Sequence, residues 1–463
     1  MSAPFQKAEL PADRQAEKKP TRATPEQSEQ PVSMPFGRHP AAAEAGIDAT
    51  RRFFSSLRAA GPARVGGLAV LALQLFLLPA EARCQEELGP QAPAAPAALR
   101  PPAVPAELDR DSARKHLDEA LTCLLREQRP DGSWGSAALE GQLEMGFSVE
   151  TYYAWQFASH GLALLALLRL PETTELRRGL DRGIDWLLET RVPARGSNWD
   201  IDYSWSALYG FVALVDVLAD PRFQQDPRRP ALEQALRVQW ALLERNESSS
   251  GGWAYYDDPP FARRPNWATS FCTALVLPAI ENATRRGWID GRDQVRRGLA
   301  ALRRSALPNG AYTYDVSDAV PRITGGEHIN QVKGSLGRIQ VCNWARAVLG
   351  DPEVTPEDLR RGLTWFFEHH KFLDVAFMRP VPHEAYYANA GYFYLFAHFY
   401  AAEVIELLPA PERESWHRRL RPHLAKIQRP DGSSTDFLGT SYLRTGGTAM
   451  AAYALMLGLD DPE

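Results

Sequence analysis

Cysteine and an excess of positive charge are both scarce in this sequence. Its 463 residues include four cysteines, and 57 acidic residues against 52 basic ones give a formal net charge of −5. So few cysteines in so long a chain exclude a disulfide framework, and their spacing suggests no zinc knuckle. We expect Cys123, Cys272 and Cys342 to be small buried side chains. The charge provides no basic field for a nucleic-acid backbone, so we expect no nucleic-acid partner.

Tryptophan and tyrosine are missing from the N-terminal part of the chain. The first tryptophan is Trp134 and the first tyrosine is Tyr152. Residues 1–50 are instead rich in Pro, Ala, Glu, Gln and Lys without an apolar period, which is typical of a disordered segment because too little apolar surface can be buried. We therefore expect a globular domain only in residues 109–463.

A basic and then apolar segment occupies residues 51–82. Arginines precede an apolar run over residues 65–78, and the small-residue triplet Ala-Glu-Ala follows it. This is the order of a secretory signal peptide, and the apolar run is short for a membrane span. We expect cleavage, export to the periplasm or the extracellular space, and no stable membrane span afterwards. Because the segment begins far from residue 1, a membrane anchor over residues 65–82 and a buried helix are the alternatives. Residues 83–108 are rich in Pro and Ala, which indicates an extended linker.

One hexapeptide occurs twice and reveals a repeat. Gln-Arg-Pro-Asp-Gly-Ser stands at residues 128–133 and again at 428–433. Weaker copies of one unit lie between them, each with a helical segment, a glycine-containing turn that ends in an aromatic residue, and a second, more apolar helical segment. The turn aromatics Trp134, Trp199 and Trp253 are about 60 residues apart, and this spacing predicts six units.

Each unit is predicted to contain two helices. The first has apolar residues at helical spacing, as in Leu117, Leu121 and Leu124, so one face should be buried. The second is apolar nearly all round and should lie inside. The first helices are predicted over residues 114–127, 172–190, 231–245, 291–304, 356–369 and 411–427. The second helices are predicted over residues 148–168, 202–218, 268–283, 333–349, 384–408 and 443–457.

Six such hairpins can close into a double-walled ring whose inner wall is formed by the apolar helices. The sequence thus predicts an all-α domain, an (α/α)6 toroid of six helical hairpins, preceded by a disordered N-terminal region. The near-identical turns of the first and last units favour neighbours across a ring closure. An open superhelical solenoid is the alternative.

The turn motif resembles a known repeat. The segment from Ala120 to Gln128, followed by Pro-Asp-Gly-Ser-Trp-Gly, is similar to the glutamine–tryptophan repeat of squalene-hopene cyclases and related prenyltransferase-like proteins. Weaker copies run from Gly183 to Trp199, from Gln239 to Trp253 and from Leu424 to Ser433. The resemblance covers about residues 110–458 and implies the toroid. It does not specify the chemistry, because terpenoid cyclases and protein prenyltransferases share the repeat.

The resemblance implies a candidate acid. Cyclases of the protonating class carry Asp-x-Asp-Asp at the start of an inner helix, where one carboxylic acid protonates an alkene. In this chain Asp200, Asp202 and Tyr203 lie at that kind of place in the second unit, with a phenol in place of the last carboxylate. The alternative is that Asp200 caps the helix and Asp202 stabilises its positive end.

The resemblance also raises the question of a metal. Protein prenyltransferases hold zinc with an Asp-x-Cys pair and a distant His. His383 is placed much as that His would be, but no Asp-x-Cys pair accompanies it, and Cys272 is the nearest substitute. We therefore expect no metal and no cofactor.

Aromatic and acidic residues gather in the turns and at the predicted starts of the inner helices. If they converge on one mouth of the ring, ring faces could stabilise carbocations or stack sugar rings, while carboxylates and His act as acid and base. The candidate catalytic residues are Asp202, His383, Tyr203 and Tyr387. The candidate ligand-binding residues are Tyr152, Trp155, His160, Asp200, Trp205, Tyr256, Asp257, Asp258, Trp267, Tyr314, His328 and Glu384. The alternative for each is a wedge between helices.

Three function classes stay open. The domain could bind an isoprenoid or carbohydrate ligand, or a partner, in its central bowl without catalysis, and the incomplete Asp motif favours this class. It could be a terpenoid cyclase of the squalene type that acts by protonation. It could also be a secreted polysaccharide lyase or hydrolase, because Tyr, His and Arg suit proton abstraction next to a uronate.

Overall fold

A computed structural model describes residues 108–137, 149–193, 202–255, 265–316, 327–383, 386–437 and 441–459. These residues form helices and no strand, apart from two isolated bridges. The outer wall contains α3 (Arg110–Glu127), α5 (Thr174–Glu189), α7 (Arg229–Asn246), α9 (Arg292–Ser305), α11 (Pro356–Glu368) and α14 (Ala410–Ala425). The inner wall contains α4 (Val149–Leu168), α6 (Trp205–Ala219), α8 (Ser270–Arg285), α10 (Leu336–Val348), α13 (Phe393–Glu406) and α15 (Ser441–Leu457). A short helix, α12 (Lys371–Ala376), and the 3-10 turns η4 (Pro221–Phe223), η5 (Glu327–Asn330) and η6 (Val332–Gly334) lie between them.

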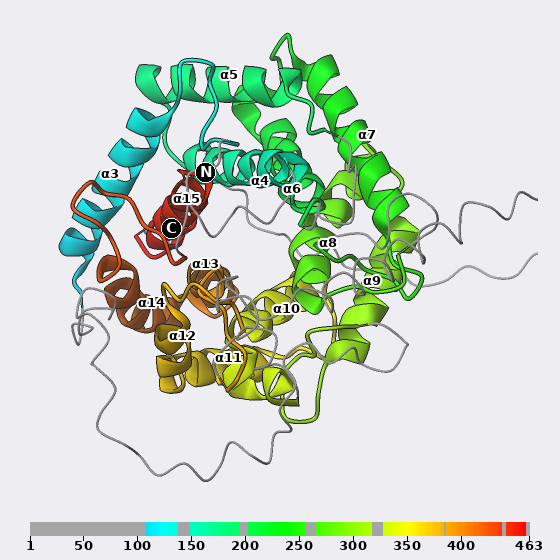
Figure 1. Cartoon of the computed structure of the whole chain (residues 1–463), viewed down its shortest axis with the longest axis vertical. Coiled ribbons are helices and arrows are strands. Elements are labelled where there is room, and N and C mark those ends of the chain that lie inside the picture. Colours follow the sequence, from blue (N-terminus) through cyan, green and yellow to red (C-terminus); the bar gives the residue numbers. More distant parts are fainter. Residues whose placement is uncertain are drawn as a thin grey trace, which may run out of the picture. The chain divides into compact units, whose positions relative to one another are not determined.

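The inner helices form a closed ring (Figure 1). Going round it, α4 packs against α6, α6 against α8, α8 against α10, α10 against α13, and α13 against α15, which packs against α4. Each outer helix packs on the inner helix that precedes it in the chain, and the first outer helix, α3, packs on the last inner helix, α15. This arrangement confirms the (α/α)6 toroid and excludes an open solenoid.

The apolar patterns of the helices explain which wall each one joins. Inner helix α6 buries side chains around its whole circumference, whereas outer helix α5 buries one stripe that includes Leu176, Leu180 and Ile184. A helix that is apolar all round must be surrounded by protein, but a helix with one apolar stripe needs covering on one side only. The sequence pattern therefore separates the two walls.

The repeated hexapeptide joins neighbouring units in the same way at both of its positions. The side-chain amide of Gln128 donates a hydrogen bond to the Gly179 carbonyl in α5 (2.8 Å). The amide of Gln428 donates to the His116 carbonyl in α3 (2.7 Å). The last unit is thus attached to the first as the first is attached to the second, which explains why these two turns are nearly identical.

A methyl group at the turn glycine should break this junction. Gly432 has a left-handed backbone (φ 83°), and a Cβ there would overlap the backbone carbonyl of Glu119 in α3. We expect Gly432→Ala to lower the free energy of unfolding by about 3 kcal/mol or more, because the backbone angle and the overlap both oppose the methyl. Urea denaturation measures the loss.

The matched control for this variant is Gly350→Ala. Gly350 also has a left-handed backbone (φ 71°), but a Cβ there would meet no atom within 4 Å. Its substitution tests the backbone angle alone and should lower the free energy of unfolding by about 1 to 2 kcal/mol. Equal losses in the two variants would contradict the steric explanation.

The aromatic residues that follow two of the turns are fully buried, as expected. Trp134 is 0% exposed and Trp253 is 1% exposed. Their indole N–H groups donate to the carbonyls of Leu124 and Leu243, at 2.8 Å and 2.7 Å. Each ring therefore fills the gap beneath its turn and satisfies a carbonyl near the end of the preceding outer helix.

The fifth unit departs from the predicted helix bounds. The sequence predicts its inner helix over residues 384–408, whereas α13 begins at Phe393. His383 and Ala388 have positive φ values of 62° and 54°, and residues in this conformation cannot continue a right-handed helix. The expectation that His383 lies at the start of an inner helix is therefore wrong. His383 belongs to the loop that leads to α13.

The structure tests the expectation for the cysteines but not the expectations for the N-terminal segments. Cys123, Cys272 and Cys342 are buried and free, as expected. The segment predicted to be disordered (residues 1–50), the predicted leader (51–82) and all but the last residue of the predicted linker (83–108) lie outside the described residues. None of the described helices has the length and apolar character needed to cross a bilayer.

Candidate active site

Asp202 lies in the segment that enters inner helix α6. Its backbone is left-handed (φ 64°), and α6 begins at Trp205. The N-cap of α6 is Ser204, and no side-chain capping bond is formed there. The Asp202 carboxyl instead accepts a hydrogen bond from the side chain of Trp155 in α4. Asp202 thus reaches across to the neighbouring inner helix and does not cap its own.

Burial raises the pKa of the Asp202 carboxyl to about 7, from an ordinary value of 3.8, and the hydrogen bond from Trp155 offsets only part of this effect. Ionisation is costly there because a carboxylate loses its hydration in an apolar environment. Asp202 therefore keeps its proton up to near neutral pH, so it can act as a proton donor.

Aromatic rings from three inner helices, α6, α8 and α13, meet in this region, and Trp155 of α4 is joined to them through its hydrogen bond with Asp202. Trp205 stacks with Tyr255 and Phe271, with ring centroids 6.3 Å and 6.2 Å apart, and Phe271 meets both Tyr314 and Phe393 edge-on at 5.3 Å. We define the central aromatic cluster as Trp155, Trp205, Tyr255, Trp267, Phe271, Tyr314, Tyr392 and Phe393. Its members come from α4, α6, α8, α13 and the segments that enter inner helices.

The Asp202 carboxyl is close enough to two other titratable side chains, Tyr392 and Cys272, to affect their pKa values. Burial raises the pKa of Tyr392, next to α13, and of Cys272 in α8, and the negative charge of Asp202 contributes to both shifts. Asp202 therefore lies within electrostatic reach of α8 and of the residue that precedes α13.

His383 is connected to the same group of residues. Its Nδ1 donates to the Ala388 carbonyl (2.6 Å), and its Nε2 accepts a hydrogen bond from the Tyr392 hydroxyl (3.0 Å). The His383 ring also meets Tyr314 edge-on at 5.8 Å. Burial lowers the pKa of His383, and the positive charge of Arg338 lowers it further. His383 is thus neutral, and Tyr392 links it to the surroundings of Asp202.

Arg338 adds a buried positive charge beside the cluster. It is 3% exposed, lies over the Tyr314 ring at 5.4 Å, and donates to the carbonyls of Tyr312 (3.2 Å) and Ile329. Within the described ranges it forms no ion pair with a carboxylate, and burial lowers its pKa to about 10. It repels a second positive charge and so helps to keep His383 neutral.

The structure brings together six of the candidate residues: Asp202, His383, Trp155, Trp205, Trp267 and Tyr314. Four further residues of this region are not indicated by any sequence pattern: Phe271, Arg338, Tyr392 and Phe393. Tyr392 and Phe393 could have been found by placing the start of α13 correctly. Phe271 and Arg338 lie on inner helices among apolar residues, where nothing in the sequence distinguishes them from ordinary core residues.

His160 has a structural environment. Its Nδ1 accepts a hydrogen bond from the Trp134 backbone N–H (3.3 Å), and its Nε2 donates to the Gly183 carbonyl (2.9 Å). In the third and sixth units the hydroxyl groups of Thr273 and Thr448 accept the equivalent hydrogen bonds, from the backbone N–H groups of Trp253 and Ser434. Since threonine serves equally well, the turn geometry accounts for this histidine.

Two further candidates form a separate group. His328 stacks on Tyr386 with ring centroids 3.9 Å apart and meets Tyr387 at 6.4 Å, and the ammonium group of Lys333 lies 5.5 Å from the Tyr387 ring. No contact joins this group to Asp202 in the part of the chain that the structure describes. Among the described residues, Tyr387 therefore makes no direct contact with Asp202.

The remaining candidates are easily placed. Tyr203 is buried next to Asp202 in the chain, and Tyr152 meets Trp155 edge-on at 5.7 Å. The other five candidates lie outside the described residues: Asp200, Tyr256, Asp257, Asp258 and Glu384.

Comparison with known proteins adds support for the fold. No family model and no curated protein matches the chain. A variant of the α-1,6-mannanase GH76A of Salegentibacter sp. HEL1_6, solved with α-1,6-mannotetrose, is 9% identical at a TM-score of 0.50, with 74% of this chain and 99% of that chain covered. A possible GH105 member from Salmonella enterica serovar Paratyphi A is 13% identical (TM-score 0.46, 76% and 94% covered).

A type II terpene cyclase, MstE from Scytonema, is also similar. It is 14% identical at a TM-score of 0.43, with 75% of this chain and 98% of that chain covered. At such identities structural likeness does not extend to chemistry. The likeness to the mannanase, at a TM-score of 0.50, therefore supports the α/α toroid fold of the described residues and nothing more.

Proposed function

We propose that the central aromatic cluster binds an apolar polyene of the isoprenoid class and that Asp202 donates a proton to it. The observation that carries this proposal is a carboxyl group that keeps its proton to near neutral pH, accepts a hydrogen bond from Trp155 and lies within electrostatic reach of Tyr392 at the other end of the central aromatic cluster. An isoprenoid chain offers no hydrogen-bonding groups, so ring faces suit it, and the same faces stabilise positive charge once it forms.

The reaction is a proton-initiated isomerisation. Transfer breaks the Asp202 O–H bond, forms a C–H bond at one alkene carbon and leaves positive charge on the other. The Tyr392 hydroxyl proton is held by His383 Nε2, so the phenol oxygen presents lone pairs to its surroundings. A proton leaving the cation can pass to this oxygen while Tyr392 gives its own proton to His383. His383 then releases this proton to solvent, and the Asp202 carboxylate takes up a proton before the next turnover. The product then has the same composition as the substrate.

Carbohydrate chemistry is less well supported by the geometry. Glycoside hydrolysis uses two carboxyl groups about 5 to 10 Å apart. Among the described residues no second carboxyl group contributes to the pKa shift of Asp202. Carbohydrate turnover is accordingly an outcome that would count against the proposal.

The test incubates the full-length protein with squalene and linear polyprenyl compounds, and separately with uronate polymers. We expect isomers of unchanged mass from the wild type and none from Asp202→Asn. The matched control is Asp436→Asn, because burial also raises the pKa of Asp436 to about 7, but its carboxylate accepts from the backbone N–H of Leu395 (2.7 Å) and lies outside the central aromatic cluster.

Three outcomes would contradict the proposal. One is equal polyene turnover by the wild type and Asp202→Asn. Another is turnover of a uronate polymer that His383→Ala removes. The third is the absence of polyene turnover together with no quenching of tryptophan fluorescence by squalene, since Trp155 and Trp205 belong to the proposed site.

Export of this domain is a further part of the proposed function. Its basis is the basic, apolar and small-residue order of residues 51–82, which matches a cleavable leader. N-terminal sequencing of the protein from its native host should find a start beyond Ala82. An intact segment 1–82 on protein from the soluble cytoplasm would refute export.

A further inference from the structure

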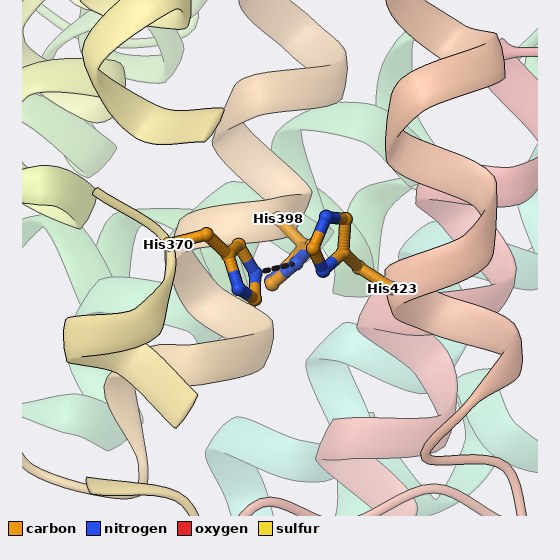
Figure 2. A group of neighbouring side chains, drawn as sticks. All are labelled: His370, His398 and His423. Atoms are coloured by element: carbon orange, nitrogen blue, oxygen red, sulfur yellow. Dashed lines mark hydrogen bonds between the residues drawn. The ribbon is translucent and has the colours of Figure 1, made fainter. Parts of the chain in front are cut away.

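Three histidines from separate segments meet within the helical walls (Figure 2). His370 directly precedes α12, His398 lies in α13 and His423 lies in α14. One ring nitrogen from each can be chosen so that all three nitrogens lie within 4.8 Å of one another. His370 and His398 are 4% and 0% exposed. None of the three belongs to the central aromatic cluster.

Hydrogen bonds determine which nitrogens of two rings carry protons. His370 Nδ1 lies 3.1 Å from Asp374 Oδ2, and the Lys426 ammonium donates to the other oxygen of the same carboxylate. The ionised carboxylate must accept, so His370 Nδ1 donates. His398 Nδ1 lies 2.7 Å from the Tyr394 carbonyl oxygen and must donate too. Both Nε2 atoms therefore carry lone pairs.

These two lone pairs face each other. His370 Nε2 and His398 Nε2 are 3.0 Å apart, and lone pairs this close repel unless a proton or a cation lies between them. Nδ1 of His423 is buried without a hydrogen-bond partner among the described residues. A metal ion would remove the repulsion between the two Nε2 lone pairs and would provide a partner for the His423 ring.

We propose that His370, His398 and His423 bind a divalent transition-metal ion, and that Zn²⁺ fits best. Neutral imidazole is a common zinc ligand, and Zn–N bonds of about 2.0 to 2.1 Å place two ligand nitrogens about 3.3 Å apart in a tetrahedron. The distance of 3.0 Å between the two Nε2 atoms is close to this value, and side-chain rotation brings the third nitrogen in. Water completes the coordination.

Neighbouring groups hold two of the three imidazoles in fixed orientations. Asp374 and the Tyr394 carbonyl orient two of the imidazoles, as the outer partners of zinc-bound histidines do. The Lys426 ammonium lies 2.6 Å from Asp374 Oδ1 and balances the negative charge of that carboxylate. The bound ion would therefore be held by three neutral imidazoles. Bound zinc would connect α12 and α13 of the fifth unit to α14 of the sixth.

The test measures zinc in the full-length protein. Protein purified without metal-affinity chromatography is stripped with a chelator, reloaded with Zn²⁺, dialysed and analysed by mass spectrometry of the elements. We expect about one zinc per chain in the wild type and below about 0.2 in His423→Gln, because glutamine fills the space without offering an imidazole. The matched control is His369→Gln, which removes the histidine beside His370 and should bind zinc as the wild type does.

Two measurements remain informative if His423→Gln does not fold. Asp374→Asn keeps all three ligands and should weaken zinc affinity by about 10- to 100-fold in competition with a chromogenic chelator. Zn²⁺ should also raise the Tm of the wild type. The proposal is overturned if folded, reloaded wild type holds less than about 0.1 zinc per chain with an unchanged Tm, or if His423→Gln binds zinc as well as the wild type.

Discussion

Asp202→Asn is expected to raise the free energy of unfolding at pH 8. The pKa of this carboxyl is about 7 in the folded protein and has an ordinary value of 3.8, so between these values the folded state binds more protons than the unfolded state. Stability of the wild type therefore falls as the pH rises from about 4 to about 8. Asparagine carries no charge and removes this dependence.

The size of the gain follows from the pKa shift. About three pK units correspond to about 4 kcal/mol, and the partial exposure of Asp202 together with the buried amide of asparagine reduces the expected gain to about 1 to 3 kcal/mol. Urea denaturation at pH 5 and pH 8 measures it, and the two proteins should differ much more at pH 8. An unchanged difference between the two pH values would show that Asp202 is ionised in the folded protein.

Asp436→Asn separates stability from function. Asp436 is buried with a similarly raised pKa, so its substitution should also flatten the pH dependence of stability. Polyene turnover should survive in Asp436→Asn and be lost in Asp202→Asn. If Asp202→Asn stabilises the protein but abolishes turnover, the destabilising Asp202 carboxyl is retained for function, and we assign proton donation as that function.

Trp134→Ala and Trp253→Ala should each lower the free energy of unfolding by about 3 to 5 kcal/mol. Both rings are fully buried beneath their turns, and each indole N–H satisfies a carbonyl near the end of an outer helix, that of Leu124 or Leu243. Removal of the ring leaves a cavity and an unpaired carbonyl together. Chemical denaturation, with the m-value checked for two-state behaviour, gives the loss.

The matched control for these variants is Trp288→Ala. Trp288 is a partly buried tryptophan that lies beneath the guanidinium group of Arg286 at 5.2 Å. Its truncation should lower the free energy of unfolding by about 1 to 2 kcal/mol, because it removes less buried surface. Losses below about 1 kcal/mol in both turn variants would mean that these rings contribute little to the junction between walls.

The ring and the order of its walls were predictable because each unit carries its own local signal. The apolar stripe of α5 and the all-round apolar character of α6 are visible over a few turns of helix, and the hexapeptide copies mark the units that meet at the closure. The start of α13 was not predictable, because apolar and aromatic residues continue through the loop before it. The left-handed backbone of His383 has no signature in composition.

The candidate site was predictable only where a motif pointed to it. Asp202 was selected from a family pattern, but its hydrogen bond to Trp155 joins two different units and has no trace in the spacing of residues. The three histidines are a stronger case, because they come from three segments and form no motif. Their proximity results from the packing of α12 and α14 on α13. The absence of a metal was expected because ligand motifs close together in the sequence, such as an Asp-x-Cys pair, were missing.

The closure of the inner ring has a consequence for how this architecture can change. In an open array each added repeat extends the stack, and the ends need specialised caps. Here Arg110 Nη2 donates to the Leu459 carbonyl (2.7 Å), so the first and last helices occupy each other's exposed faces. Insertion or loss of one hairpin would change the curvature at every junction at once. Changes in loop length or in side-chain identity leave this ring closed, whereas a change in the number of hairpins would require every junction to adjust.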